Sequence, residues 1–229
     1  MNILNVSTVI LGPALFWAGY HYYKDRHKPE PFLTLLFTYA LGIGAGYLGL
    51  HAYAALDWFG LRFDAYELAR SDAFGLFWYS VLVIGVVEET VKFLPFWFIV
   101  MRISHFDERL DGLIYASFIG LGFASYENLH YMNLLGTQEA FLRGIASPIV
   151  HVMFASVWGY LCAWARLSGR PVLPAALLGL LLASVMHGIY DFLLITGAVW
   201  LRPLAGMLIL AVWVWRMHLI RRLNRRGRG

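Results

Sequence analysis

Apolar stretches long enough to cross a lipid bilayer follow one another along almost the whole 229-residue chain. Hydrophobic residues make up 60% of the sequence and charged residues only 14%, whereas a soluble domain is usually about a quarter charged. A helix needs about 20 apolar residues to span the hydrocarbon core of a bilayer. The sequence therefore predicts an integral membrane protein with an all-α fold, and it leaves no room for a separate soluble domain.

We expect about seven transmembrane helices, joined by short connections, in a single membrane domain over 1–229. Their predicted ranges are 3–22, 31–54, 74–101, 112–134, 144–165, 172–197 and 200–217. The first range lacks the basic start and the A-x-A cleavage site of a signal peptide, so we interpret it as a retained span. The polar and aromatic segment 55–73 indicates an interfacial loop or a short surface helix. Asp72 and Asp111 each precede an apolar run and are candidate helix caps.

The basic residues predict the direction of the chain, because cytoplasmic loops carry an excess of Lys and Arg. One set of connections holds thirteen of them and the opposite set holds four. The thirteen are Lys24, Arg26, Lys28, Arg102, Arg109, Arg166, Arg170, Arg216, Arg221, Arg222, Arg225, Arg226 and Arg228, and the four are Arg62, Arg70, Arg143 and Arg202. We expect a multi-pass protein of the cell membrane with a cytoplasmic C-terminus and, for seven spans, an N-terminus outside. The net charge of +4 reflects this orientation, and no nucleic-acid partner is expected.

Two adjacent carboxylates, Glu88 and Glu89, interrupt the third predicted span. The other ionisable side chains within 73–101 are Tyr79 and Lys92. A charge at bilayer depth costs roughly 2.5–3.5 kcal/mol on insertion scales, so three charges within five residues need an explanation. Lys92 is four residues from one acid and three from the other, so it can pair with either on the same helix. The presence of Lys92 at this depth is sufficiently explained if it neutralises a neighbouring glutamate.

The next three predicted spans also carry polar groups at depth. Glu127 lies in the fourth span, His151 in the fifth, and His187 and Asp191 in the sixth, four residues apart on one helix face. Because successive spans run in opposite directions, these groups fall near the two glutamates at mid-membrane, displaced toward the outer leaflet. A lone histidine in a span is usually a packing residue, but desolvated carboxylates cost too much to serve only as helix contacts. The pattern predicts one hydrated polar cluster.

Carboxylates beside imidazoles in a wet intramembrane cavity suit hydrolysis. A glutamate can take a proton from water, a second acid or histidine can pass it on, and a histidine N–H can hold an oxyanion. The sequence contains neither G-x-S-x-G nor H-E-x-x-H, which favours attack by water over an acyl-enzyme. Zinc is an open alternative, because Glu127, His151 and His187 would supply a Glu-His-His set with water as fourth ligand. Cys162 is the sole cysteine, so a thiolate metal cluster is excluded.

Taken in order, these motifs resemble those of the PrsW family of intramembrane proteases, within the superfamily of CAAX-processing and bacteriocin-processing membrane proteases. The stretch YKDRHKPEP at 23–31 is similar to the family's first cytoplasmic loop, and EETVK at 88–92 is similar to its E-E-x-x-K. The stretch DGLIYASFIGLGFASYENLHY at 111–131 is similar to D-G-x-x-Y and F-x-x-x-E-N. HGIYD at 187–191 is similar to H-x-x-x-D.

The resemblance implies an endopeptidase that cleaves a single-pass membrane protein within the bilayer. In the family's namesake activity the reaction is site-1 cleavage of an anti-sigma factor under envelope stress. The superfamily resemblance favours a glutamate-activated water without a cofactor, although PrsW proteins are often grouped with metalloproteases. Zinc dependence therefore stays open.

The resemblance also implies roles for individual residues. The candidate catalytic set is Glu88, Glu89, Lys92, Glu127, His151, His187 and Asp191. In this set Glu88 would be the base with Glu127 as its partner. His187 and Asp191 would form the oxyanion site, and Lys92 would hold Glu89. The choice of base stays open, because adjacent helical residues point about 100° apart.

Three other functions are compatible with buried polar groups. A proton-coupled transporter could use the same Glu/His network, but it predicts inverted repeats and broken helices in matching halves. Instead, glycines crowd 42–46 without a counterpart elsewhere. A haem protein could use His51, His151 or His187 as axial ligands, and a receptor or scaffold without catalytic activity would tolerate loss of the acids.

Overall fold

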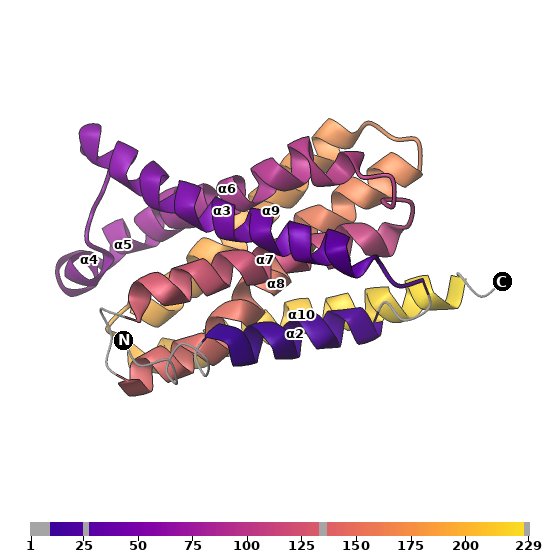
Figure 1. Ribbon diagram of the computed structural model, residues 1–229. Helices are drawn as coiled ribbons and strands as arrows, with labels where there is room; N and C mark the ends of the chain where they lie inside the picture. The colour runs from indigo at the N-terminus through magenta and orange to yellow at the C-terminus, as the bar shows by residue number, and fades with distance from the viewer. Residues whose placement is uncertain (1–9, 25–27, 133–136, 227–229) are drawn as a thin grey trace.

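Every regular element in the described residues, which cover 10–24, 28–132 and 137–226, is a helix (Figure 1). This computed structural model confirms the all-α prediction. The α-helices are α2 (Gly12–Lys24), α3 (Phe32–Trp58), α4 (Ala65–Ser71), α5 (Ala73–Tyr79), α6 (Val86–Phe98), α7 (Arg109–Tyr131), α8 (Thr137–Leu167), α9 (Val172–Ile195) and α10 (Arg202–Arg226). The π-helix η2 (Ser80–Gly85) joins α5 and α6 into one rod, and η3 (Val100–Arg102) and η4 (Val199–Leu201) are short 3₁₀ turns.

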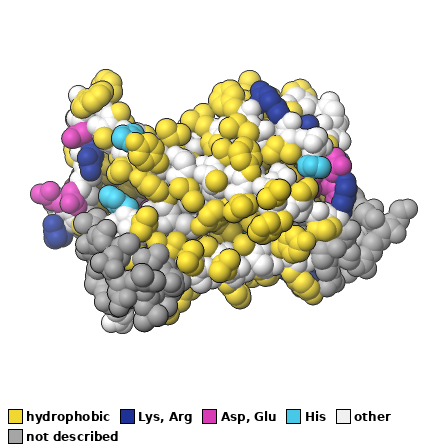
Figure 2. Space-filling model, viewed as in Figure 1, with side chains coloured by type: hydrophobic (Ala, Val, Ile, Leu, Met, Phe, Trp, Pro, Cys, Tyr) yellow, Lys and Arg dark blue, Asp and Glu magenta, His cyan; other side chains and the backbone are white. Residues whose placement is uncertain are grey.

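Four of the described helices are long and apolar enough to cross a membrane. They cover Phe32–Trp58, Gln138–Leu167, Val172–Ile195 and Val199–Asn224. Figure 2 shows hydrophobic side chains over the middle of the viewed face and the charged and histidine side chains gathered at its two ends. This distribution is the one expected of a membrane protein. The count of seven spans stays a prediction, and the expected span 3–22 lies partly outside the described residues.

Helix α7 runs through the centre of the bundle, where nearly all of its side chains from Leu110 to Ser125 are buried. Glycines let α3 approach it backbone to backbone. A Cβ placed on Gly42 would lie 2.1 Å from the Ile119 carbonyl oxygen, and one on Gly122 would lie 2.0 Å from the Tyr39 carbonyl oxygen. Small residues at such contacts are typical of membrane helix packing, which explains the glycine-rich part of α3.

The segment 55–73 is partly helical. It contains the end of α3, a connection over 59–64 and the short exposed helix α4, as expected for an interfacial segment. The predicted cap Asp72 accepts a hydrogen bond from the backbone N–H of Gly75 at 2.9 Å and precedes α5. The cap prediction for Asp111 is wrong by three residues, because α7 already begins at Arg109. Its carboxylate instead accepts the backbone N–H of Glu108 at 2.6 Å from within the first turn.

Arg216 was predicted to lie in a connection between spans, but the structure places it inside helix α10. We expected the last span to end at 217, but α10 continues to Arg226. The Arg216 side chain is only 1% exposed and donates hydrogen bonds to the Ser156 hydroxyl and, at 3.4 Å, to the Val152 carbonyl of α8. This arginine therefore does not count among the loop residues that support the predicted orientation.

Candidate active site

The adjacent acids Glu88 and Glu89 lie in the first turn of helix α6, which follows the π-helix η2 directly. π-helical turns are rare in proteins, and those that interrupt longer helices are often found at functional sites. Both acids are buried, with 6% of Glu88 and none of Glu89 exposed. Because they are neighbours on one helix, they point in different directions and meet different partners.

Glu89 accepts hydrogen bonds from three side chains. Lys92 Nζ lies 2.5 Å from Oε1, His187 Nδ1 lies 2.7 Å from the same oxygen, and Trp158 Nε1 lies 2.9 Å from Oε2. The expectation that Lys92 holds Glu89 is confirmed. Trp158 was missed from the sequence. A buried indole N–H usually needs an acceptor, but nothing in the sequence identified which one.

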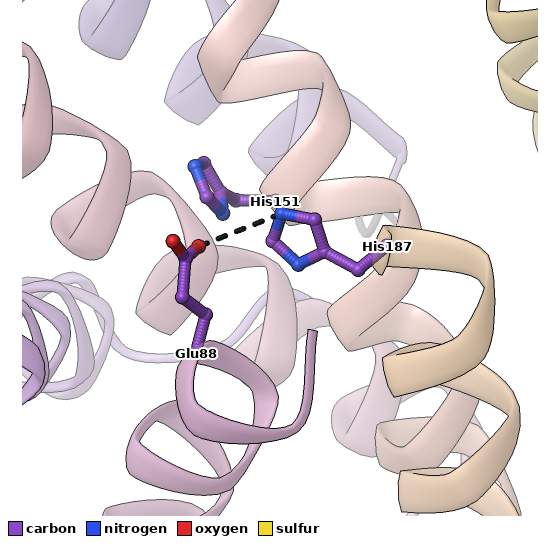
Figure 3. Close-up of side chains that lie close together, drawn as sticks. All are labelled: Glu88, His151 and His187. Carbon is purple, nitrogen blue, oxygen red and sulfur yellow. Dashed lines mark ion pairs between the residues drawn. The ribbon is translucent and has the colours of Figure 1, made fainter. Parts of the chain in front are cut away.

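His187 faces Glu88 with its second ring nitrogen. Its Nδ1–H donates to Glu89, so in the neutral ring Nε2 carries a lone pair. Nε2 lies 3.5 Å from Glu88 Oε2 and 3.7 Å from Asp191 Oδ2. Glu88 Oε2 is buried without a hydrogen-bond partner among the described residues. Two acceptors that face each other this way leave a place for a proton or a cation between them, and both can bond to one water beside them (Figure 3).

His151 is held at both ring nitrogens. Lys92 Nζ donates to Nδ1 at 3.1 Å, so Nε2 carries the proton and donates to Glu127 Oε2 at 2.9 Å. The other oxygen of Glu127 forms an ion pair with Arg143 Nη2 at 2.7 Å. Glu127 therefore has partners on both oxygens, and the contacts extend from α6 across α8 to α7.

A cavity of about 670 Å³ contains these groups. Five of the seven predicted residues line it, namely Glu88, Glu127, His151, His187 and Asp191. Glu89 and Lys92 lie behind this surface. The cavity lining also includes Tyr53 of α3, whose hydroxyl donates to Glu88 Oε1 at 3.3 Å. Sequence reasoning missed Tyr53, because tyrosines are common in membrane helices and nothing in its own span marked it.

Glu88, His151 and His187 are arranged so that a metal ion could bind. One ligand atom from each lies within 4.8 Å of the others, and carboxylate with imidazole is a donor set that zinc accepts. The sequence interpretation had placed Glu127 in this set, but in the structure Glu88 takes that position. Among the described residues Glu88 Oε2 has no hydrogen-bond partner, and His187 Nε2 has the longer contacts to Glu88 and Asp191, whereas His151 must first exchange a contact with Lys92 or Glu127. With that exchange, the residues fit a divalent cation.

Comparison with known proteins identifies the family. The family model described as "PrsW family intramembrane metalloprotease" matches residues 30–217. The chain is 29% identical to Protease PrsW of Bacillus subtilis (strain 168), over 89% of this chain and 88% of that protein. It is 28% identical to Protease PrsW of Oceanobacillus iheyensis over 97% of both chains, and 29% identical to Protease PrsW of Clostridioides difficile (strain 630) over 95% and 87%.

No solved structure matches the chain. The relatives are named as proteases, so they do not favour the transporter alternative. The family match covers most of the chain and includes both acids of α6 and the polar residues of α7, α8 and α9. The chain therefore belongs to the PrsW family of intramembrane proteases.

Proposed function

We propose that this chain hydrolyses a peptide bond of a single-pass membrane protein, with Glu88 as the base that activates water. One observation carries the proposal. Glu88 Oε2 is buried without a hydrogen-bond partner among the described residues, and it faces His187 Nε2 across 3.5 Å at the cavity wall. Glu89 is a poorer candidate for the base, because both of its oxygens already accept hydrogen bonds.

The chemistry needs a proton acceptor and donor in one place. A water that bonds to both Glu88 and His187 from the cavity side would give its proton to Glu88 as its oxygen bonds to the substrate carbonyl carbon. Glu88 would then return the proton to the leaving nitrogen as the C–N bond breaks, which is the usual double role of a general base. The Tyr53 hydroxyl supports this role, because it donates to the other oxygen of the same carboxylate.

The oxyanion of the tetrahedral intermediate needs a hydrogen-bond donor. When His187 takes up a proton on Nε2, it becomes such a donor. Asp191 lies 3.7 Å from that nitrogen, and Glu89 holds the other ring nitrogen at 2.7 Å. We assign Glu127 to the positioning of His151, because its oxygens are held by His151 and Arg143.

The set of Glu88, His151 and His187 fits a divalent cation, as the family's description also suggests. When bound, such an ion would act as a Lewis acid on the carbonyl and make a bound water more acidic. Metal content of the purified protein tests this. If the set holds zinc, Glu88→Gln and His187→Ala lose the metal that wild type and Glu108→Gln retain, and a chelator abolishes cleavage. Full cleavage by metal-free protein would assign the water to Glu88 alone.

Co-expression with a tagged single-pass membrane protein tests the proposed activity. We expect a fragment with wild type, and a loss of about 10²-fold or more in Glu88→Gln, since general bases contribute 10²–10⁴-fold. Glu108→Gln at the start of α7 is the matched control, because it makes the same chemical change in a partly exposed side chain. Protein levels are compared by immunoblot. Undiminished cleavage by Glu88→Gln would refute the assignment of the base.

The natural substrate can be sought by comparing membrane-protein fragments in cells with and without the chain. We propose an anti-sigma factor or a similar single-pass regulator of a stress response, as the family resemblance implies. We also propose a cytoplasmic C-terminus and an N-terminus outside, supported by the basic residues near Lys24 and Arg221. Accessibility of tags at the two ends to externally added protease tests this orientation.

A further inference from the structure

The helices around the cavity form a wall that is closed on most sides. Helix α3 packs against α7, α7 against α8, α8 against α9, and α9 against η2, α5 and α4. Helix α3 also packs against α6, but within the described chain no comparable packing joins it to α4, α5 or η2. This last junction, which we call the seam, separates the C-terminal half of α3 from the α4–α5–η2 side of the cavity.

The packing of α3 changes along its length in a way that opens the seam. The buried residues of α3 end at Gly49, and the following residues 50–58 contain none. In Figure 1, this end of α3 diverges from α4 and α5. The connection after α3 is attached to the other side, because the Phe63 N–H donates to the Tyr79 hydroxyl at 3.3 Å.

Both sides of the seam contribute to the cavity. Leu50 and Tyr53 line it from α3, and Tyr79 and Ile84 line it from α5 and η2. Leu50 is 38% exposed, so no other side chain of the described residues fully covers it at this part of the cavity wall. Tyr53 also donates to Glu88, which places the seam one side chain away from the candidate base.

We propose that the substrate polypeptide enters the cavity sideways from the lipid, through the seam between the C-terminal half of α3 and the α4–α5–η2 side. The proposal rests on the proposed proteolytic function and names the route to the same site. The end of α3 is the side that moves to open the seam, because α3 has no buried residues beyond Gly49.

The lining of the cavity indicates the form of the substrate segment. Unpaired backbone groups are very costly in lipid, so a transmembrane segment can unwind only where other polar groups receive its N–H and C=O groups. The cavity supplies such groups from six tyrosines, which are Tyr53, Tyr66, Tyr79, Tyr126, Tyr131 and Tyr190. The structure thus fits a locally unwound stretch of a transmembrane helix, with aromatic rings around its side chains.

A pair of reversible cross-links tests the route. Leu50→Cys with Ile84→Cys locks the seam. Leu167→Cys with Leu173→Cys locks the end of α8 to the start of α9, two helices that already pack against each other, at exposed positions outside the cavity lining. Both are made with Cys162→Ala, joined by disulfide-containing bifunctional thiol reagents of graded length, and assayed on the tagged single-pass protein that wild type cleaves.

We expect the seam lock to reduce cleavage at least tenfold, reduction of the cross-link to restore it, and the α8–α9 lock to leave it within twofold. Cleavage that survives the seam lock, or that both locks abolish equally, would overturn the lateral route. The proposed function is judged separately, because the uncross-linked variants must cleave whatever the locks do. If wild type itself cleaves no membrane protein, the proposed function fails and the route fails with it.

Discussion

Removing the Lys92 ammonium is expected to destabilise the fold far more than removing an equally short ion pair at the surface. Lys92 Nζ lies 2.5 Å from Glu89 Oε1, and both side chains are fully buried. Lys28 Nζ is also 2.5 Å from Asp107 Oδ1, but 53% and 54% of these side chains are exposed. Breaking a buried pair by removing one partner costs about 3–5 kcal/mol, whereas an exposed pair contributes about 0–1 kcal/mol. Lys92→Met should therefore raise the unfolding equilibrium constant roughly 10²- to 10⁴-fold.

The measurement is reversible unfolding in mixed micelles, followed by tryptophan fluorescence as the fraction of denaturing detergent rises. Lys28→Met is the matched control and should stay within about 1 kcal/mol of wild type. The double variant Lys92→Met with Glu89→Gln leaves neither charge buried, so it should recover much of the loss. If Lys92→Met is as mild as Lys28→Met, or if the double variant is no better than the single one, the argument from burial is refuted.

Three further changes test the packing and the site. Gly42→Ala places a Cβ 2.1 Å from a carbonyl oxygen of α7 and should lower the free energy of unfolding by about 1–3 kcal/mol in the same assay. The control Gly44→Ala meets nothing within 4 Å and should be neutral or stabilising, so equal effects of the two changes would contradict the close approach of α3 to α7. Tyr53→Phe removes the hydroxyl that donates to the candidate base, so kcat/KM for the tagged substrate should fall roughly 2- to 10-fold without loss of folded protein. An unchanged kcat/KM would exclude a role for that hydroxyl. Trp158→Phe leaves a buried oxygen of Glu89 without its hydrogen-bond donor and should lower the free energy of unfolding by about 1–3 kcal/mol. A change near zero would mean that another group donates to this oxygen in the variant.

The positions of the helices were largely predictable from the sequence. The expected range 172–197 corresponds to α9, Val172–Ile195, because the apolar length of a span is a local property of the chain. The largest errors lie where helices continue past the apolar run. Helix α10 extends to Arg226, since polar residues can prolong a helix in water as readily as they can end it.

Most of the residues that gather at the candidate site could also be selected from the sequence, but their contacts could not. Glu127, His151 and His187 attract attention in a sequence because polar groups are costly at bilayer depth, and the structure brings them to one cavity. Tyr53 and Trp158 belong to the same network, yet tyrosine and tryptophan are common throughout this sequence and in membrane proteins generally. Residue type alone therefore did not distinguish them.

The sequence by itself determined that this chain lies in a membrane and which residues resist a purely structural explanation, because the cost of transferring a side chain into lipid depends on the residue alone. Only the tertiary structure decided that Glu89 accepts three hydrogen bonds while one oxygen of Glu88 has no hydrogen-bond partner in the described part of the chain. The two acids are chemically identical neighbours. What separates them is the rotation of α6 against α8 and α9, and that rotation follows from packing across the whole bundle.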